Sequence, residues 1–100
     1  MNISLKKYPN KSKDFINLYN IYLDDEEVGS VELIKNTKSI ESFFIDENYR
    51  GRGIGTEVLK KATELGYTNI CVVPSNTGAI KLYEKCGFKP VLIKMQYRKE

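Results

Sequence analysis

A run of six residues at positions 50–55, Arg-Gly-Arg-Gly-Ile-Gly, constrains the fold of this chain more than any other feature. It stands directly after a strand-like segment, residues 40–45, and opens a helix-like one. Glycine adopts positive φ angles and has no side chain, so a ligand can approach the backbone closely. The first N–H groups of a helix are unpaired and lie at the positive end of its dipole. The run therefore predicts a strand–turn–helix unit that seats a phosphate, for which Arg50 and Arg52 would add fork-like donors.

The first half of the chain is strand-like. Four segments rich in β-branched and aromatic residues are joined by short polar connections, which favours an antiparallel meander. The predicted strands are residues 3–8, 15–23, 28–34 and 39–45, and the polar turns between the last three are 24–27 and 35–38.

The spacing of the apolar residues changes in the second half. It becomes helical over residues 54–65 and 79–86, and each stretch ends at a glycine, a common signal for the end of a helix. Between them, residues 70–73 are fully apolar and predict a short strand that is covered on both faces. A strand, a helix of about twelve residues and a second strand form a right-handed crossover, so the strands near Ile45 and Val73 should be parallel.

After the second helix, residues 88–97 return to an extended pattern that is long enough for one strand or a tight pair. The predicted fold is of the α+β class. It has a mixed, mostly antiparallel sheet with one parallel pair of strands and two helices packed on it.

Length and composition bound the class of protein. The chain fits a single domain, residues 1–100, and 41% of its residues are apolar, which is enough for one modest core. Forming a homodimer would be an easy way for so short a chain to gain core. No apolar run reaches the length of a membrane span, and the polar N-terminus has no signal-peptide core. We therefore expect a cytoplasmic protein without a membrane partner.

The charges and the cysteines argue against several kinds of site. The net charge of +3 comes from 16 basic and 13 acidic residues that are mixed along the chain, so no nucleic-acid partner is expected. The chain has no His and two Cys, so neither a metal site of the usual zinc types nor a histidine-based dyad is expected. Cys71 lies in an apolar run and is interpreted as a core thiol. For Cys86, near the end of a helix, a nucleophilic role is the less favoured interpretation.

Three glycine-rich templates compete for residues 50–55. A dinucleotide fingerprint that starts at Gly51 would need a glycine at Thr56, and it normally belongs to the first strand–helix unit of a domain. A Walker A loop needs four residues between its glycines and then Lys with Ser or Thr, which this chain lacks. The third template, Gln/Arg-x-x-Gly-x-Gly/Ala, is matched by Arg50, Gly53 and Gly55.

With this third pattern, the chain resembles the GNAT family of N-acetyltransferases. A second family signature lies at residues 76–88, Asn-Thr-Gly-Ala-Ile-Lys-Leu-Tyr-Glu-Lys-Cys-Gly-Phe, and residues 43–50 look like the family's fourth strand running into its loop. The resemblance covers residues 28–88. It implies a GNAT-like fold whose fourth and fifth strands are parallel but splayed. It also implies direct transfer of an acetyl group from acetyl-CoA to a primary amine in a ternary complex.

The resemblance further implies how acetyl-CoA would be held. Backbone N–H groups of the glycine-rich loop would bind its pyrophosphate. Backbone groups near Phe44 and Ile45 would pair with the pantetheine arm and polarise the thioester carbonyl. Asn76 would reach the arm from the other side, cap the second helix, or do both. The implied cofactor-binding residues are Phe44, Ile45, Arg50, Gly51, Arg52, Gly53, Ile54, Gly55, Thr56, Asn76 and Tyr83.

Two residues are implied to be catalytic. Tyr83 matches the family position whose phenol, with a pKa of about 10, donates to a leaving thiolate whose thiol has a pKa of about 8.5. The family often uses a carboxylate on the fourth strand as base. Glu41 fits because it shares strand parity with Phe43 and Ile45, and Glu32 is the second choice. Each has a plain structural interpretation as well: ring packing on the sheet for Tyr83, and a solvated strand residue for Glu41.

The upstream part of the chain departs from the family pattern. Members usually place two helices between their first and second strands, which form one wall of the acceptor site, whereas here only residues 9–14 separate those segments. We therefore expect an exposed acceptor site, or one completed by a second subunit, that suits a bulky acceptor such as a protein lysine or N-terminus. The alternatives to an acetyltransferase are a non-catalytic acyl-CoA-binding or regulatory module and, third, a nucleotide-phosphate-binding domain.

Overall fold

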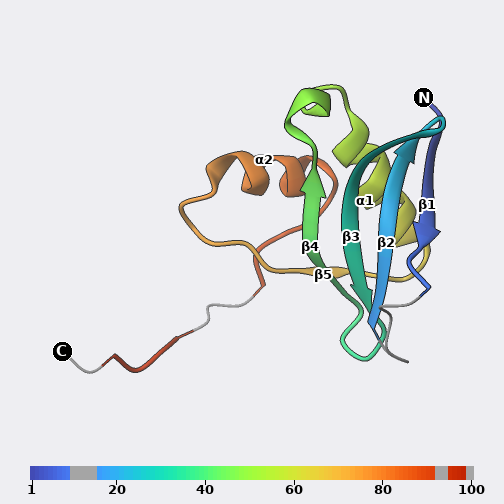
Figure 1. Cartoon of the computed structure of the whole chain (residues 1–100). Coiled ribbons are helices and arrows are strands. Elements are labelled where there is room, and N and C mark those ends of the chain that lie inside the picture. Colours follow the sequence, from blue (N-terminus) through green and yellow to red (C-terminus); the bar gives the residue numbers. More distant parts are fainter. Residues whose placement is uncertain (10–15, 92–94, 99–100) are drawn as a thin grey trace.

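A computed structural model describes residues 1–9, 16–91 and 95–98 (Figure 1). In chain order its elements are β1 (Ile3–Lys7), β2 (Ile16–Leu23), β3 (Glu26–Ile34), β4 (Ser39–Ile45), the short 3-10 helix η1 (Glu47–Tyr49), α1 (Ile54–Glu64), β5 (Asn69–Ile70) and α2 (Thr77–Lys85). The strands form one sheet in the order β1-β2-β3-β4-β5. Neighbouring strands are antiparallel except for β4 and β5, which are parallel. The predicted α+β fold with a mixed sheet and two helices is confirmed.

The turns of the meander lie close to their predicted places. β3 begins at Glu26 rather than at Val28, so the turn after β2 consists only of Asp24 and Asp25. The predicted turn over residues 35–38 is found, and β1 and β2 agree with prediction within a residue over their described parts. Phe15, the predicted start of the second strand, lies outside the described residues.

The core lies between the sheet and α1, which Figure 1 shows behind the strands. The aliphatic side chains that are at most 1% exposed come from three strands and α1: Ile21, Val28, Val31, Leu33, Ile40, Ile54, Val58, Leu59 and Ala62. Fully burying a large aliphatic side chain stabilises a fold by about 1.5–3 kcal/mol. The packing of α1 on the sheet therefore contributes a large part of the stability.

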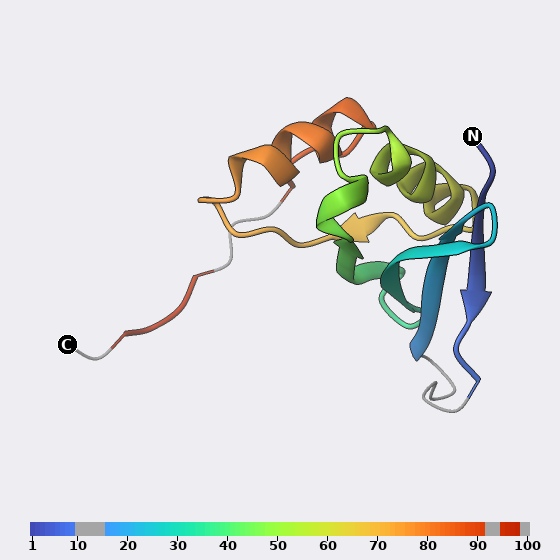
Figure 2. The same cartoon turned by 45° about the horizontal axis from the view of Figure 1, so that its top comes forward.

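α2 packs on the same face of the sheet as α1. An added Cβ atom at Gly55, in the first turn of α1, would lie 3.3 Å from a methyl carbon of Leu82 and 3.7 Å from the ring of Phe43. Leu82, Tyr83 and Cys86 of α2 are half-buried and pack against the core. Both helices therefore share one layer, as Figure 2 shows from above.

A bulge interrupts β4 opposite Val31. The register pairs on either side of it are Ser30 with Phe44 and Glu32 with Glu41. Two residues, Ser42 and Phe43, therefore lie opposite the single Val31. Ser42 has a φ of 47°, an uncommon left-handed conformation for a residue other than glycine.

The bulge changes which side chains of β4 share a face. The β3 partners of Glu41 and Phe44 lie two residues apart and so point to the same face, which places Glu41 and Phe44 together. Phe43 and Ile45 pack against the core on the opposite face. The predicted parity of Glu41 with Phe43 and Ile45 is therefore wrong, because the extra residue reverses the alternation.

β5 is shorter than predicted. It pairs with β4 through Asn69 and Ile70 only. Beyond these residues the segment that follows β5 separates from β4, as the resemblance implied (Figure 1). Cys71 is exposed and the side chain of Val73 is 63% exposed. The prediction of a strand covered on both faces, with a core thiol at Cys71, is wrong. The reason is that β5 ends at Ile70, so Cys71 and Val73 belong to the segment that leaves the sheet.

The chain after α2 also differs from expectation. Residues 88–91 and 95–98 belong to no strand, so neither one long strand nor a tight pair is found among them. The remaining residues of the predicted segment, 92–94, lie outside the described part. None of the helices in the described ranges is long and apolar enough to cross a membrane.

Gly29 on β3 allows the backbone of β4 to come very close. An added Cβ atom would collide with the carbonyl oxygen of Phe44 and lie 3.1 Å from the Cα atom of Ile45. Because these obstacles are backbone atoms, Gly29→Ala should lower the free energy of unfolding in urea by about 3 kcal/mol.

Gly78→Ala provides the matched control for this prediction. An added Cβ atom there meets no atom within 4 Å, and the position is helical. The free energy of unfolding of this variant should stay within about 0.5 kcal/mol of the parent or rise above it. A Gly29→Ala protein as stable as the Gly78→Ala protein would contradict the close approach of β3 and β4.

Candidate functional site

A cleft of about 620 Å³ lies between the end of β4, the loop that follows it, the start of α1 and α2. Every residue that the sequence implied for cofactor binding lines this cleft, with the exception of Arg52. The structure thus brings together Phe44, Ile45, Arg50, Gly51, Gly53, Ile54, Gly55, Thr56, Asn76 and Tyr83. Segments far apart in the sequence, the glycine-rich loop and Tyr83 among them, form one site.

Arg50 folds the loop back onto β4. Its Nε atom donates a hydrogen bond to the carbonyl oxygen of Ile45 at 2.8 Å, and its guanidinium carbon lies 5.4 Å from the centre of the Phe44 ring. A hydrogen bond from a charged donor stabilises more than a neutral one. The bond joins the two ends of the segment between β4 and the glycines, and so holds the glycine-rich loop at the cleft.

Gly51 and Gly53 adopt conformations that other residues rarely take. Their φ angles are 77° and 82°, in the left-handed region. Gly53 is the N-cap of α1 and supplies no capping side chain. The unpaired N–H groups of the first turn of α1 are therefore next to the cleft, where the lining includes Gly55 and Thr56. This arrangement suits an anion such as a phosphate.

η1 is joined to the start of β3. The phenol of Tyr49 is hydrogen-bonded to Glu26, and this bond is the main cause that raises the pKa of Tyr49. The guanidinium carbon of Arg52 lies 5.2 Å from the centre of the Tyr49 ring. Arg52 therefore lies beside the cleft and not in its lining, and its contact with a phosphate stays a prediction.

Asn76 lies on the opposite wall of the cleft and caps α2. Its Oδ1 atom accepts a hydrogen bond from the backbone N–H of Ala79 at 3.2 Å. The sequence left open whether this residue caps a helix or faces a ligand. The structure shows the cap and places the residue in the cleft lining, while contact with a ligand remains a prediction.

Tyr83 combines ring packing with a place in the cleft. Its ring meets that of Phe88 edge to face, with centroids 6.2 Å apart and an interplanar angle of 62°. Burial raises the pKa of the Tyr83 phenol above its ordinary value of 10.0. The phenol is therefore protonated at neutral pH and can donate a proton or a hydrogen bond.

The charges of the cleft have one sign. The lining contains two cations, Arg50 and Lys85, and no carboxylate. A cleft lined by one sign of charge concentrates ligands of the opposite sign. The site therefore favours an anionic ligand.

Sequence reasoning missed four residues of α2 that line the cleft: Gly78, Ala79, Leu82 and Lys85. They recur at spacings of three and four positions, which places them on one face of a helix. Their spacing could have identified them once that face was known to point at the cleft.

The two candidate bases lie outside the cleft lining. Glu32 and Glu41 are direct neighbours across β3 and β4, on the face of the sheet away from the core. Glu32 is half-buried and Glu41 is exposed. Phe44 shares this face, is 51% exposed and lines the cleft. The cleft thus borders the face that carries both carboxylates.

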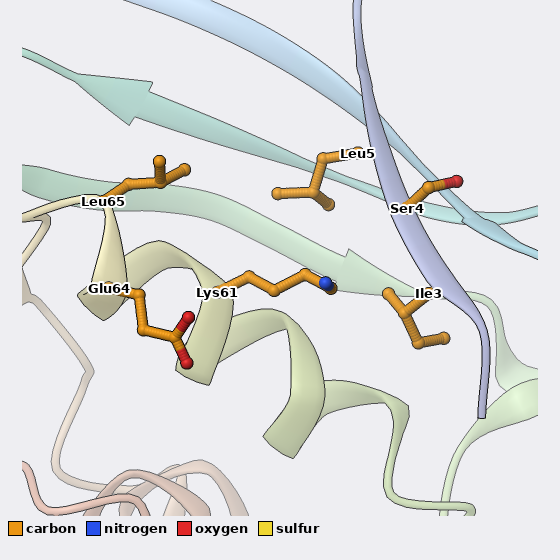
Figure 3. Close-up of a pocket in the computed structure, with 6 residues that line it drawn as sticks. All are labelled: Ile3, Ser4, Leu5, Lys61, Glu64 and Leu65. Atoms are coloured by element: carbon orange, nitrogen blue, oxygen red, sulfur yellow. The ribbon is translucent and has the colours of Figure 1, made fainter.

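Two other features do not form a comparable site. A hollow of about 400 Å³ lies between β1 and the C-terminal part of α1, where Lys61 and Glu64 of α1 present opposite charges (Figure 3). It contains none of the residues that the sequence singled out. The cysteines Cys71 and Cys86 are free thiols, and the described residues include no group of three or more His, Cys, Asp or Glu placed to hold a metal ion.

Proteins similar to this chain in sequence include N-acetyltransferases. The sequence model of the Acetyltransferase (GNAT) family matches residues 4–88. The chain is 31% identical over 70 residues to the uncharacterized N-acetyltransferase YobR of Bacillus subtilis, in an alignment that covers 64% of this chain and 28% of that protein. It is 34% identical over 61 residues to the uncharacterized N-acetyltransferase MJ1207 of Methanocaldococcus jannaschii, covering 55% of this chain and 27% of that protein. The matched segments thus span less than a third of these curated relatives.

Solved structures show the same fold. AAC(6')-Iy, in complex with the bisubstrate analog CoA-S-monomethyl-acetylneamine, matches with a TM-score of 0.77 at 13% identity, over 100% of this chain and 99% of that one. A GNAT family acetyltransferase from Elizabethkingia anophelis with acetyl-CoA bound matches with a TM-score of 0.69 at 23% identity, over 88% and 76%. Fold and family model agree with the signatures at residues 50–55 and 76–88, and the chain belongs to the GNAT family of acetyltransferases.

Proposed function

We propose that this protein is an N-acetyltransferase that transfers the acetyl group of acetyl-CoA to a primary amine by direct attack in a ternary complex. The observation that carries the proposal is the cleft, which joins the glycine-rich loop and the end of β4 to Asn76 and Tyr83. Membership of the family supports acetyl-CoA as the donor. The structure from Elizabethkingia anophelis, which has the same fold, has acetyl-CoA bound.

The start of α1 would hold the pyrophosphate of the donor. The N–H groups at Gly53, Gly55 and Thr56 line the cleft without a competing cap side chain. Arg50 is already fixed beside them by its bond to Ile45, so little of its side-chain freedom remains to be lost on binding. Arg52 next to the loop adds a further positive charge.

The pantetheine arm would lie between the end of β4 and the start of α2. The backbone at Phe44 and Ile45 reaches the cleft from one side and Asn76 from the other. Since the oxygen of the Asn76 amide accepts from Ala79, the NH₂ group is the end that can donate to a carbonyl of the arm. Donors at the end of β4 would also polarise the thioester carbonyl.

Tyr83 would act on the leaving group. As the amine nitrogen bonds to the carbonyl carbon, the C–S bond breaks and its electron pair stays on sulfur. The phenol of Tyr83 then donates its proton to the thiolate, which becomes the thiol of free CoA. The raised pKa of this phenol keeps the proton in place until the thiolate forms.

A carboxylate on the acceptor side would take the proton of the amine. Glu41 lies on the face of the sheet where Phe44 borders the cleft, and it would act through water. Glu32, its direct neighbour across the strands, is the second choice. The acceptor would approach from this side of β4, where Phe44 and Glu41 are exposed. That side admits a small molecule, a protein lysine or a protein N-terminus alike.

Calorimetric titration with acetyl-CoA, ATP and NAD tests the donor. Acetyl-CoA should bind and the two nucleotides should bind at least about tenfold more weakly, because only acetyl-CoA carries the arm. Tight binding of ATP or NAD would favour a nucleotide-binding domain instead.

Arg50→Lys keeps the positive charge but removes the Nε donor that bonds Ile45. It should weaken acetyl-CoA binding about tenfold, because the loop loses its tie to β4. In Arg52→Lys, the matched control, the exposed charge is kept and no such tie is lost, so binding should change less than about threefold. Equal losses in the two variants would refute a holding role for the Arg50 bond.

Tyr83→Phe tests the proposed acid. With an amine that is turned over, kcat should fall by about a hundredfold or more while the Kd of acetyl-CoA stays close to that of the parent. Tyr97→Phe, on the exposed C-terminal segment, should leave both constants unchanged. Normal turnover in Tyr83→Phe would refute the role of Tyr83 as the acid. If no panel of amines and peptides gave free CoA from the parent protein, the binding-module alternative would be favoured.

The pH profile provides an independent check. The phenol must be protonated to donate, and its pKa lies above 10.0 in the folded protein. The rate should therefore rise with pH as the amine and its base lose protons, and should decline only once the pH passes the raised pKa of Tyr83. The decline should be absent from the residual activity of Tyr83→Phe, and a decline below pH 9 in the parent would contradict the assignment.

A further inference from the structure

One face of the sheet has no helix on it in the part of the chain that the structure describes. Both α1 and α2 pack on the opposite face, as the contacts of Gly55 and the core residues show (Figures 1 and 2). We call the uncovered side of β1, β2 and β3 the open face. The strand register places even-numbered residues of β1 and β2 on it.

The open face carries more apolar surface than a solvated face usually does. Ile16 and Ile34 are direct neighbours across β2 and β3, and Leu18 and Tyr22 lie on the same side of β2. All four side chains remain partly exposed. An antiparallel sheet with one solvated face normally alternates apolar and polar residues cleanly. Four large apolar side chains on the second face indicate that another layer packs there.

The charges on the open face are separated. Lys6 is on the edge strand β1, and its Nζ atom lies 4.6 Å from the centre of the Tyr22 ring, so the ammonium leans over the apolar side chains. Glu27 and Glu32 are on β3, with β2 in between. Lys6 is level with Asn20 of β2 and Ser30 of β3. Its ammonium leans toward Tyr22, whose partner on β3 is Glu27.

This arrangement is complementary to itself. A twofold axis parallel to β2 and above it would bring β2 of two copies together and place β1 of each copy over β3 of the other. Lys6 then comes over the acidic strand of the second copy, and the apolar side chains of the two faces meet between the charges. Such an interface forms every contact twice, and aligned sheets pack in this way about 10 Å apart.

We propose that the open face packs on the same face of a second copy of this chain, with Lys6 of each copy pairing with Glu27 of the other. The contact covers the apolar side chains of β2 and gives Glu27 a cation. β4 stays outside the contact, so Phe44 and Glu41 remain accessible at its border.

The second copy would also complete the acceptor site, a clause that rests on the proposed function. β1 of that copy would run beside β4 and form the wall that this chain lacks between its first two strands. The pairing of the open faces does not itself depend on acetyl transfer.

Sedimentation velocity over about 1–100 µM protein tests the pairing, because a dissociation constant in this range is expected of a modest interface. The parent should sediment as a dimer of 11.5-kDa chains. Lys6→Glu and Glu27→Lys should each raise the dissociation constant about tenfold or more by placing like charges opposite each other. The double variant Lys6→Glu/Glu27→Lys should return it to within about threefold of the parent.

Lys7→Glu is the matched control. Lys7 is the next residue of β1 and carries the same charge, but it pairs with Tyr19 on the side of the sheet that faces the core. Its dissociation constant should equal that of the parent, and circular dichroism should show that all four variants are folded. A parent that is monomeric throughout, a dimer indifferent to the single substitutions, or a double variant as weak as the single ones would overturn the proposal.

The calorimetric titration with acetyl-CoA separates this proposal from the proposed function. If the double variant restores the dimer but the protein binds no acetyl-CoA, the proposed interface is supported and the proposed function is refuted. A monomer that binds acetyl-CoA and releases CoA with an amine would do the reverse.

Discussion

The brief pairing of β4 with β5 is the constraint on which the rest of the structure depends. The two strands are parallel, so the chain must cross over between them, and α1 makes that crossing while it fills the core. Their pairing ends at Ile40 and Ile70. Beyond that point the end of β4 has no neighbour on the β5 side, and the glycine-rich loop and α2 face each other across a cleft instead. A longer β5 would stabilise the sheet and close the site.

Features that depend on local chemistry were predicted well from the sequence. Gly66 and Gly87 were expected to end the two helices, and both have a φ of 97° just beyond a helix end. The glycines of the loop and the cap at Asn76 follow the same logic, since each meets a conformational or hydrogen-bonding need within a few residues. The parallel crossover was also predictable, because a chirality rule leaves few alternatives.

Features that depend on the neighbouring strands were not predicted from the sequence. The bulge at Ser42 has no signal in the sequence of β4, because a serine with a positive φ is uncommon and only the register with β3 reveals it. The face assigned to Glu41 was wrong for this reason. The prediction for Cys71 was wrong for a related reason: an apolar run does not say whether anything covers it, and the chain leaves the sheet after Ile70. Lys85 became part of the site only once α2 was placed against the cleft.

The cap of α2 has a consequence for recognition. An amide side chain is nearly symmetric in shape, so a free asparagine can turn either its oxygen or its nitrogen toward a ligand. In Asn76 the amide oxygen accepts a hydrogen bond from the backbone N–H of Ala79, so formation of the helix fixes the orientation of the amide group. The NH₂ group is then the end of the Asn76 side chain that is left to donate, so we expect a ligand that presents a carbonyl to Asn76 to fit this wall better than one that presents an N–H.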